Sequence, residues 1–280
     1  MRIAVLPLIA VAAAAGPAAA SEVVLDLLHF DGFEAPAPTA FRLGALMLRD
    51  PHVFVPVPLG PVTLCTDATD VADVGLNPQI AASLVADADA NGRYDTSPLL
   101  VFEPLRGDGL PGRVSDRNGD CSVATPLQCT PAAAVTPARA YRSFALTGSD
   151  HCLEPLAGTT STWTSGAPVP QPGGACYATT AADLVLNTGA VAIPLFDTRF
   201  GAPLPATVGS TGGGLLRGFL RASDAAVITV PVNGSNMTLA SLLPGGAGSC
   251  RANLAGGVDS WNGESGWWFY FEYRQDAALP

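Results

Sequence analysis

Short apolar runs separated by dense turn signals dominate the hydrophobic pattern of this chain. In residues 53–59 the side chains alternate, with Val53, Val55 and Val57 on one face and prolines on the other. Proline cannot donate to a β ladder, so Pro56 and Pro58 predict that this strand lies at a sheet edge. The pattern is typical of an all-β domain.

Further strands are expected wherever a similar apolar run occurs. These runs cover residues 23–30, 41–48, 99–105, 141–146, 183–186, 190–196, 226–232 and 267–273. Many are apolar on both faces, as strands covered by two layers are. We therefore predict a single β-sandwich domain, jelly-roll-like, with long disulfide-pinned loops, over residues 21–280.

Helical signals are few. Asn236 is a candidate N-cap for a short helix over 237–243, which Pro244 and the glycines after it would end. Residues 215–222 carry leucines and a phenylalanine at near-helical spacing, although Gly218 lowers the helix propensity of this segment.

Two segments rich in glycine and proline predict long loops. Residues 107–138 are irregular and contain two cysteines, and loops of this length are usually functional sites or linkers. A domain division near residue 135 is the alternative, but the C-terminal half has too few clean strands to fold alone. Residues 161–174 form the second such loop.

The N-terminus has the three parts of a secretory signal peptide. A short positive n-region, Met1-Arg2, precedes an apolar stretch over 3–16, and Ala18 and Ala20 form an A-x-A cleavage site. The apolar stretch is shorter than the roughly 20 residues that span a bilayer. We expect cleavage after residue 20 and a periplasmic or extracellular protein; a buried N-terminal helix is the alternative.

Composition narrows the possible partners. The net charge is −10, which argues against binding to nucleic acid or to anionic membrane surfaces. Beyond residue 20 no segment is long and apolar enough to predict a transmembrane segment. Lysine is absent, and alanine, glycine and proline are in excess, which is typical of a GC-rich bacterial genome.

The six cysteines predict three disulfides, because an even number in an exported chain is usually paired. Proximity along the chain favours Cys121–Cys129 and Cys152–Cys176, which leaves Cys65–Cys250. A zinc site is less well supported, because no C-x-x-C spacing occurs.

The segment Asp87-Ala88-Asp89-Ala90-Asn91-Gly92-Arg93-Tyr94-Asp95 is the sharpest local motif. Side-chain oxygens at alternate positions can meet at one hard cation, and the glycine at position 6 allows a sharp turn. The candidate calcium ligands are Asp87, Asp89, Asn91, the backbone carbonyl of Arg93, and Asp95.

These nine residues resemble the calcium loops of EF-hand and dockerin modules, which implies a calcium site. The resemblance ends at position 12, where Pro98 replaces the acidic ligand, and the flanks read as strands. A weaker second motif, with Asp116, Asn118 and Asp120, either completes the first site or forms another. For both motifs the alternative is a solvated Asn-Gly turn.

An aromatic cluster near the C-terminus is a candidate ligand-binding face. Alternation over 267–273 places Trp268 and Tyr270 on one side of a strand, where flat rings can stack on sugars. The alternative is a central strand buried on both sides.

Catalytic motifs are scarce. No G-x-S-x-G elbow, P-loop or dinucleotide-binding glycine motif occurs. Ser149, Asp150 and His151 are adjacent in sequence, which does not make a triad, because triad residues meet in space. Candidates for a glycosidase carboxylate pair are Glu34, Glu103, Glu154, Glu264 and Glu272.

The interpretation that best fits these patterns is an exported, non-catalytic, calcium-stabilised module that binds a glycan or a protein. The alternatives are a secreted polysaccharide hydrolase and a structural envelope protein without a soluble ligand.

Overall fold

The computed structural model describes residues 39–72, 75–124, 127–134, 136–145, 152–159, 175–187, 191–204, 213–232, 235–253 and 257–278. All of them belong to one compact unit, Pro38–Pro280. The expected signal peptide (1–20), the expected strand at 23–30 and the expected loop at 161–174 lie outside the described residues.

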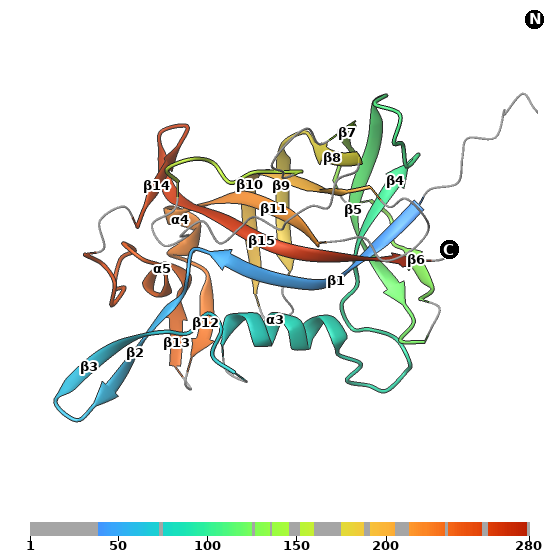
Figure 1. The fold of residues 1–280 in the computed structure, drawn as a ribbon. Helices are drawn as coiled ribbons and strands as arrows, with labels where there is room; N and C mark the ends of the chain where they lie inside the picture. The colour runs from blue at the N-terminus through green and yellow to red at the C-terminus, as the bar shows by residue number, and fades with distance from the viewer. Residues whose placement is uncertain are drawn as a thin grey trace, which may run out of the picture. The chain divides into compact units, whose positions relative to one another are not determined.

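One large antiparallel sheet contains most of the strands (Figure 1). Eight of them pair in chain order: β1 (Thr39–Asp50), β4 (Pro98–Glu103), β5 (Gly112–Cys121), β7 (Arg139–Ala145), β8 (Ala175–Thr179), β10 (Ala192–Pro203), β11 (Gly213–Arg221) and β15 (Glu264–Ala278). β1 pairs with β4 and also with β15, so the pairings return to the first strand and the sheet closes on itself. The remaining members are short: β6 (Cys129–Pro131) pairs with β5, β9 (Ala182–Asn187) with β10, and β14 (Asp259–Trp261) with β15.

The all-β prediction is confirmed, since strands account for fifteen of the eighteen described elements. The jelly-roll sandwich is not confirmed. A jelly roll has two facing sheets joined by Greek-key connections, whereas these strands pair with their neighbours in the chain within a single sheet.

Aromatic rings fill part of the core. Phe102 on β4 meets Phe41, Tyr141 and Tyr177 edge to face, with ring centroids 5.0 to 5.7 Å apart. The hydroxyls of Tyr177 and Tyr273 are 3.0 Å apart. These rings come from β1, β4, β7, β8 and β15, so strands distant in the sequence share one core.

β5 and β6 lie where the sequence predicted an irregular loop over 107–138, and that prediction is wrong. β5 has no alternating apolar pattern, because several of its side chains are polar and pair with charged residues on neighbouring strands. Arg117 contacts Glu103 at 2.7 Å, and Asp116 contacts Arg139 at 3.1 Å.

β11 replaces the helix suggested by residues 215–222. Its side chains alternate between two buried clusters, with Leu216 and Leu220 in one and Leu215 and Phe219 in the other. A strand buried on both faces has a continuous apolar run, which imitates helical spacing. Gly218 permits close strand packing, since a Cβ there would lie 2.3 Å from Thr198 Cγ2.

The predicted helix over 237–243 is shorter and starts later. α5 spans Leu239–Leu242, and its N-cap is Thr238, whose side chain accepts a hydrogen bond from the Ser241 amide. Asn236 lies instead in β13 (Ser235–Thr238), which pairs with β12 (Thr229–Val232). The one-turn helix α4 (Ala222–Ala225) follows β11.

α3 (Leu76–Val85) is a helix that the sequence pattern did not reveal. It begins after Gly75, without a side-chain cap, and has a proline in its first turn. Tertiary contacts hold it: the buried Asn77 accepts from the Leu48 amide at 2.7 Å and donates to the Leu48 carbonyl at 2.9 Å. This pair of bonds docks α3 on β1.

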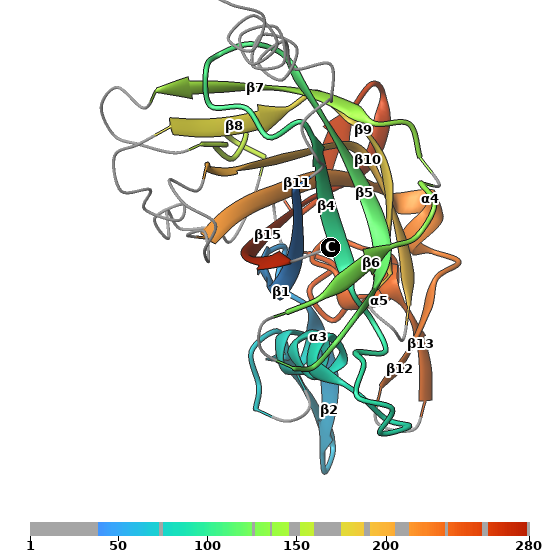
Figure 2. The ribbon, with the colours of Figure 1, turned by 90° about the vertical axis from the view of Figure 1, so that its right-hand side faces the viewer.

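The proline-containing strand is β2 (Phe54–Leu59), which pairs only with β3 (Val62–Asp67) in a separate two-stranded sheet. The edge position predicted from Pro56 and Pro58 is therefore confirmed. Figures 1 and 2 show this hairpin at the same end of the large sheet as α3 and the β12–β13 hairpin.

All three predicted disulfides are confirmed: Cys65–Cys250, Cys121–Cys129 and Cys152–Cys176. The first joins β3 to the segment after α5, over a sequence separation of 185 residues. Among the described helices, none combines the length and the apolar character needed to cross a membrane.

Candidate functional site

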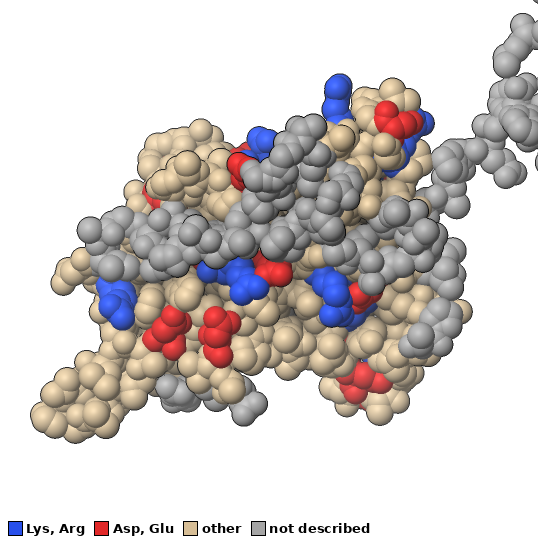
Figure 3. Space-filling model, viewed as in Figure 1, with Lys and Arg blue, Asp and Glu red and all other residues tan. Residues whose placement is uncertain are grey.

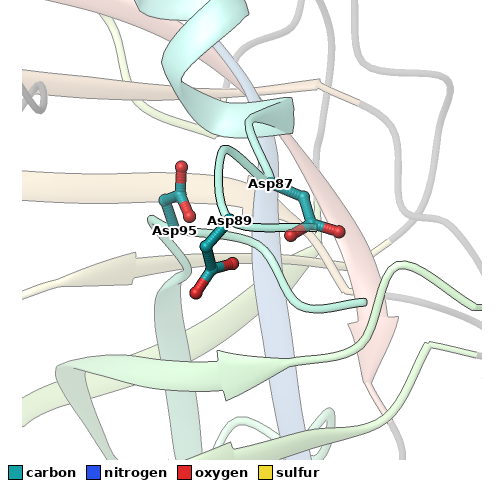
Figure 4. A group of neighbouring side chains, drawn as sticks. All are labelled: Asp87, Asp89 and Asp95. Atoms are coloured by element: carbon teal, nitrogen blue, oxygen red, sulfur yellow. The ribbon is translucent and has the colours of Figure 1, made fainter. Parts of the chain in front are cut away.

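The acidic loop of residues 87–95 joins α3 to β4, and Figure 4 shows its three aspartates below the end of the helix. Asp87, Asp89 and Asp95 each place a carboxylate oxygen within 4.8 Å of the others. Among the described residues, these aspartates are the one group of three or more acidic or metal-ligating side chains close enough together to hold a metal ion. Calcium prefers carboxylate and carbonyl oxygens, so this set fits it chemically.

The backbone of the loop is curled around its own side chains. The amides of Asn91 and Gly92 donate to the two Asp87 oxygens at 2.9 and 3.0 Å, and the Arg93 amide donates to Asn91 Oδ1 at 2.8 Å. Gly92 has φ of +81°, the left-handed conformation for which the motif needs glycine. These bonds preorganise the loop.

Arg42 on β1 is hydrogen-bonded to both ends of the loop. Its guanidinium donates to the carbonyl of Leu84, at the end of α3, and to the carbonyl of Thr96 at 3.2 Å. It also lies over the Tyr94 ring, 3.8 Å from the centroid. Burial lowers the pKa of Arg42 from its ordinary value. A single buried side chain thus fixes the helix end, the loop and the entry to β4.

The β5–β6 hairpin braces the loop on its other side. The Tyr94 amide donates to the Cys121 carbonyl at 3.0 Å, and the Val123 amide donates to the Gly92 carbonyl at 3.0 Å. Arg93 forms an ion pair with Asp120 at 2.8 Å. Because Cys121 and Cys129 are joined, this brace is covalently closed.

The sequence predicted a strand on each side of this loop, which is wrong for the upstream flank and right for the downstream one. The upstream flank is the helix α3 and not a strand, so the loop connects a helix to a strand. Downstream, Pro98 begins β4 and pairs with Asn118, so position 12 supplies no side-chain ligand.

The second acidic motif lies inside β5 and forms neither a turn nor a cation cluster. Asp116 pairs with Arg139, Asp120 pairs with Arg93, and Asn118 is exposed opposite Pro98. Both carboxylates of the motif therefore form ion pairs with arginines and not a cation site. Asp120 touches the first loop through Arg93, which links the two motifs without making a shared ligand set.

The proposed aromatic face is buried, so Trp268 and Tyr270 do not form a surface platform. Their exposed fractions are 3% and 0%. Tyr270 lies under residues 152–159, where its hydroxyl accepts from the Leu156 amide at 3.1 Å and lies 2.6 Å from Thr159 Oγ1. The strand is central and covered on both sides, which was the alternative interpretation.

Beside this cluster, Asp259 on β14 is half-buried and accepts a hydrogen bond from the Trp268 amide at 3.1 Å. Burial raises the pKa of its carboxyl group to about 6. No feature of the sequence distinguished this aspartate.

Two of the candidate catalytic carboxylates form ion pairs with arginines. Glu103 is bound by Arg117, and Glu272 by Arg49. Glu34, Ser149, Asp150 and His151 lie outside the described residues.

An apolar cavity of about 460 Å³ is the feature that sequence reasoning missed. It lies at the end of the large sheet, among α3, β2, β12, α5, the start of β10 and the middle of β15. Its residues come from across the chain, so no local motif could have revealed it.

Comparison with protein-family models, with curated proteins and with solved structures found no match to this chain.

Proposed function

We propose that this protein is an exported, non-catalytic protein that binds calcium in the loop of residues 87–95 and uses the ion to stabilise its fold. The observation that carries the proposal is the approach of three carboxylates to within 4.8 Å on a loop curled by its own hydrogen bonds. Carboxylates this close repel each other in water, and a divalent cation removes that repulsion.

The position of the loop explains why the ion would be structural. Arg42 ties the loop to β1, and the disulfide-closed hairpin ties it to β5. An ion that rigidifies the loop therefore stabilises the junction of α3, β1, β4 and β5. The signal peptide read from the sequence and the three disulfides support export to an oxidising compartment.

Binding to a glycan or a protein partner remains part of this proposal, but burial of Trp268 and Tyr270 removes the surface assigned to sugar. A pull-down on insoluble polysaccharides, with calcium and with EGTA, distinguishes a glycan ligand from a protein partner. Calcium-dependent retention supports a glycan ligand. Absence of retention in both buffers favours a protein partner or a structural role.

Isothermal titration calorimetry of the oxidised chain with CaCl2 tests the calcium site directly. We expect one site with a dissociation constant of about 10⁻⁴–10⁻³ M, the range of extracellular modules. The double variant Asp89→Asn/Asp95→Asn removes two charges from the loop and is expected to lose the binding heat. The matched control is Asp108→Asn, an exposed aspartate outside the loop. Equal affinity in all three proteins would refute the assignment.

A further inference from the structure

The cavity has a buried apolar floor formed by strands of the large sheet. Phe269 and Phe271 on β15 are 1% and 0% exposed, and Ile193 on β10 is 5% exposed. Ile80 on α3 and Leu242 on α5 close the floor at its sides. These residues are also members of the main hydrophobic core, so the core itself forms the floor of the cavity.

The walls are made by the small elements gathered at this end of the molecule (Figures 1 and 2). Val55 on β2 and Val53 just before this strand form one wall. α3 contributes Leu76, and β12 contributes Val230 and Val232. Because short hairpins and a helix surround it, the cavity is bounded on several sides and is not a flat sheet face.

The chemistry of the lining is almost entirely hydrocarbon. None of the described lining residues is charged, and the polar side chains among them are Gln79 and Ser83. These two lie four residues apart on α3, so they project from the same side of the helix. Ser83 Oγ donates to the Ile80 carbonyl at 2.8 Å, which leaves its oxygen lone pairs able to accept another bond.

We propose that this cavity binds a neutral small molecule, mostly hydrocarbon, with one hydrogen-bonding group directed to Gln79 and Ser83. Its volume falls within the roughly 300–1,000 Å³ of small-molecule sites. Large apolar cavities bind apolar molecules readily, because water inside them finds no hydrogen-bond partners. A carboxylate or phosphate would lose its hydration and meet no cation in the lining, so a charged ligand is excluded by the same chemistry.

The proposal does not depend on the calcium site. The cavity and the loop of residues 87–95 share no described residue. Loss of calcium binding with retention of the apolar ligand, or the reverse, therefore distinguishes failure of one proposal from failure of the other.

Fluorescence titration of the full oxidised chain, freed of bound lipid by organic extraction, tests the proposal. The probe is N-phenyl-1-naphthylamine, which is neutral and brightens in apolar sites. We expect saturable binding, and displacement by 1-dodecanol at concentrations at least tenfold lower than by dodecanoate at pH 8. A linear, unsaturable signal overturns the proposal, and equal or better displacement by dodecanoate overturns the neutral class of ligand.

Cavity-filling variants locate the bound probe. Ala68→Phe places a ring in the lining and is expected to weaken binding at least tenfold, whereas Ala81→Phe, on the exposed side of α3, leaves it unchanged. Circular dichroism checks that both variants fold, and Val55→Trp serves as a second filling variant if Ala68→Phe does not. Unchanged affinity in a folded filling variant contradicts the location. A protein that is dimeric in solution and does not bind the probe would instead indicate that a second copy fills the cavity, and would overturn the proposal.

Discussion

Arg139 on β7 has a buried guanidinium, each of whose three nitrogens donates a hydrogen bond. It pairs with Asp116 at 3.1 Å and donates to the Thr198 carbonyl at 2.7 Å, while the residue is only 3% exposed. A buried pair of this kind contributes little relative to apolar residues of the same size, but removing one partner leaves an uncompensated charge. The pair therefore specifies how β5, β7 and β10 meet.

Replacing one member of this pair should cost far more than replacing both. We expect Arg139→Met to lower the free energy of unfolding by about 3–5 kcal/mol, because Asp116, whose side chain is only 15% exposed, would lose its charged partner. The double variant Arg139→Met/Asp116→Leu should recover most of that loss. Urea denaturation of the wild type, of the single variants Arg139→Met and Asp116→Leu and of the double variant measures the cycle. A double variant no more stable than Arg139→Met alone would contradict the argument.

Asp259 makes stability depend on pH. Its pKa is about 6 in the folded state, above the ordinary value of 3.8, because burial disfavours the charged form. Because the pKa of Asp259 is higher in the folded state, its protonated carboxyl group contributes stability to the fold. This contribution is fully present below pH 3.8 and is lost as the pH rises through 6. At pH 7 the ionised carboxylate therefore destabilises the fold.

The variant Asp259→Asn should relieve this destabilisation. An amide oxygen can still accept the Trp268 N–H, and the charge is absent. We expect a gain of about 1 kcal/mol at pH 7, a figure reduced to allow for the partial exposure of the group. Little gain is expected at pH 3.5. Chemical denaturation at the two pH values provides the measurement, and an equal gain at both would show that the carboxylate is not desolvated.

Among the elements, the β strands with apolar alternation were predictable and those stabilised by tertiary partners were not. β1, β4, β7 and β15 follow runs of alternating or continuous apolar residues. β5 was missed because its charges find arginine or glutamate partners on other strands, and α3 because Asn77 docks it through β1. β11 was misjudged because burial on both faces removes the alternation that marks a strand.

The candidate sites also differ in how far the sequence predicted them. The acidic loop was predictable because its oxygens lie on nine consecutive residues, and the disulfides because chain proximity sufficed. The cavity was not, because β2, β10, β12 and β15 reach it from positions far apart in the chain. Whether Trp268 faces solvent depends on what covers its strand, which a single-strand pattern does not encode.

The Cys121–Cys129 hairpin should set the calcium affinity of the loop that it braces. Its backbone bonds to Tyr94 and Gly92 hold the loop in its curled form before any ion binds. We expect the paired variant Cys121→Ser/Cys129→Ser to weaken calcium binding by about fivefold or more through loss of preorganisation. Removing Cys152–Cys176, which lies elsewhere, is the control. Equal affinities in the two variants would show that the brace is irrelevant to the loop.

At the scale of the molecule, closure of the sheet and one long-range disulfide hold the chain together. The β1–β15 pairing removes the exposed edges that an open sheet would present. Outside that ring, the β2–β3 hairpin carries exposed apolar residues at its tip, and Figure 3 shows no charged side chain on the visible face of this hairpin. Leu59, Val62 and Leu64 are 63%, 55% and 48% exposed.

Cys65–Cys250 tethers this hairpin to the segment that follows α5. Because it closes a loop of 185 residues, the chain-entropy model assigns it about 5 kcal/mol of stabilisation, against about 2.5 kcal/mol for the short loop of Cys121–Cys129. We expect Cys65→Ser/Cys250→Ser to be the more destabilised of the two double variants in urea. The opposite order would indicate that the unfolded chain is already compact near Cys65.

The measurement that tests the central claim most directly is thermal unfolding of the oxidised chain in 10 mM CaCl2 and in EGTA, beside the variant Asp89→Asn/Asp95→Asn. A structural calcium site with the affinity given above should stabilise the wild type by about 1.4–2.7 kcal/mol at this concentration and leave the variant unaffected. A wild-type unfolding curve that is the same in both buffers, or a variant that calcium stabilises as much as the wild type, would contradict the account.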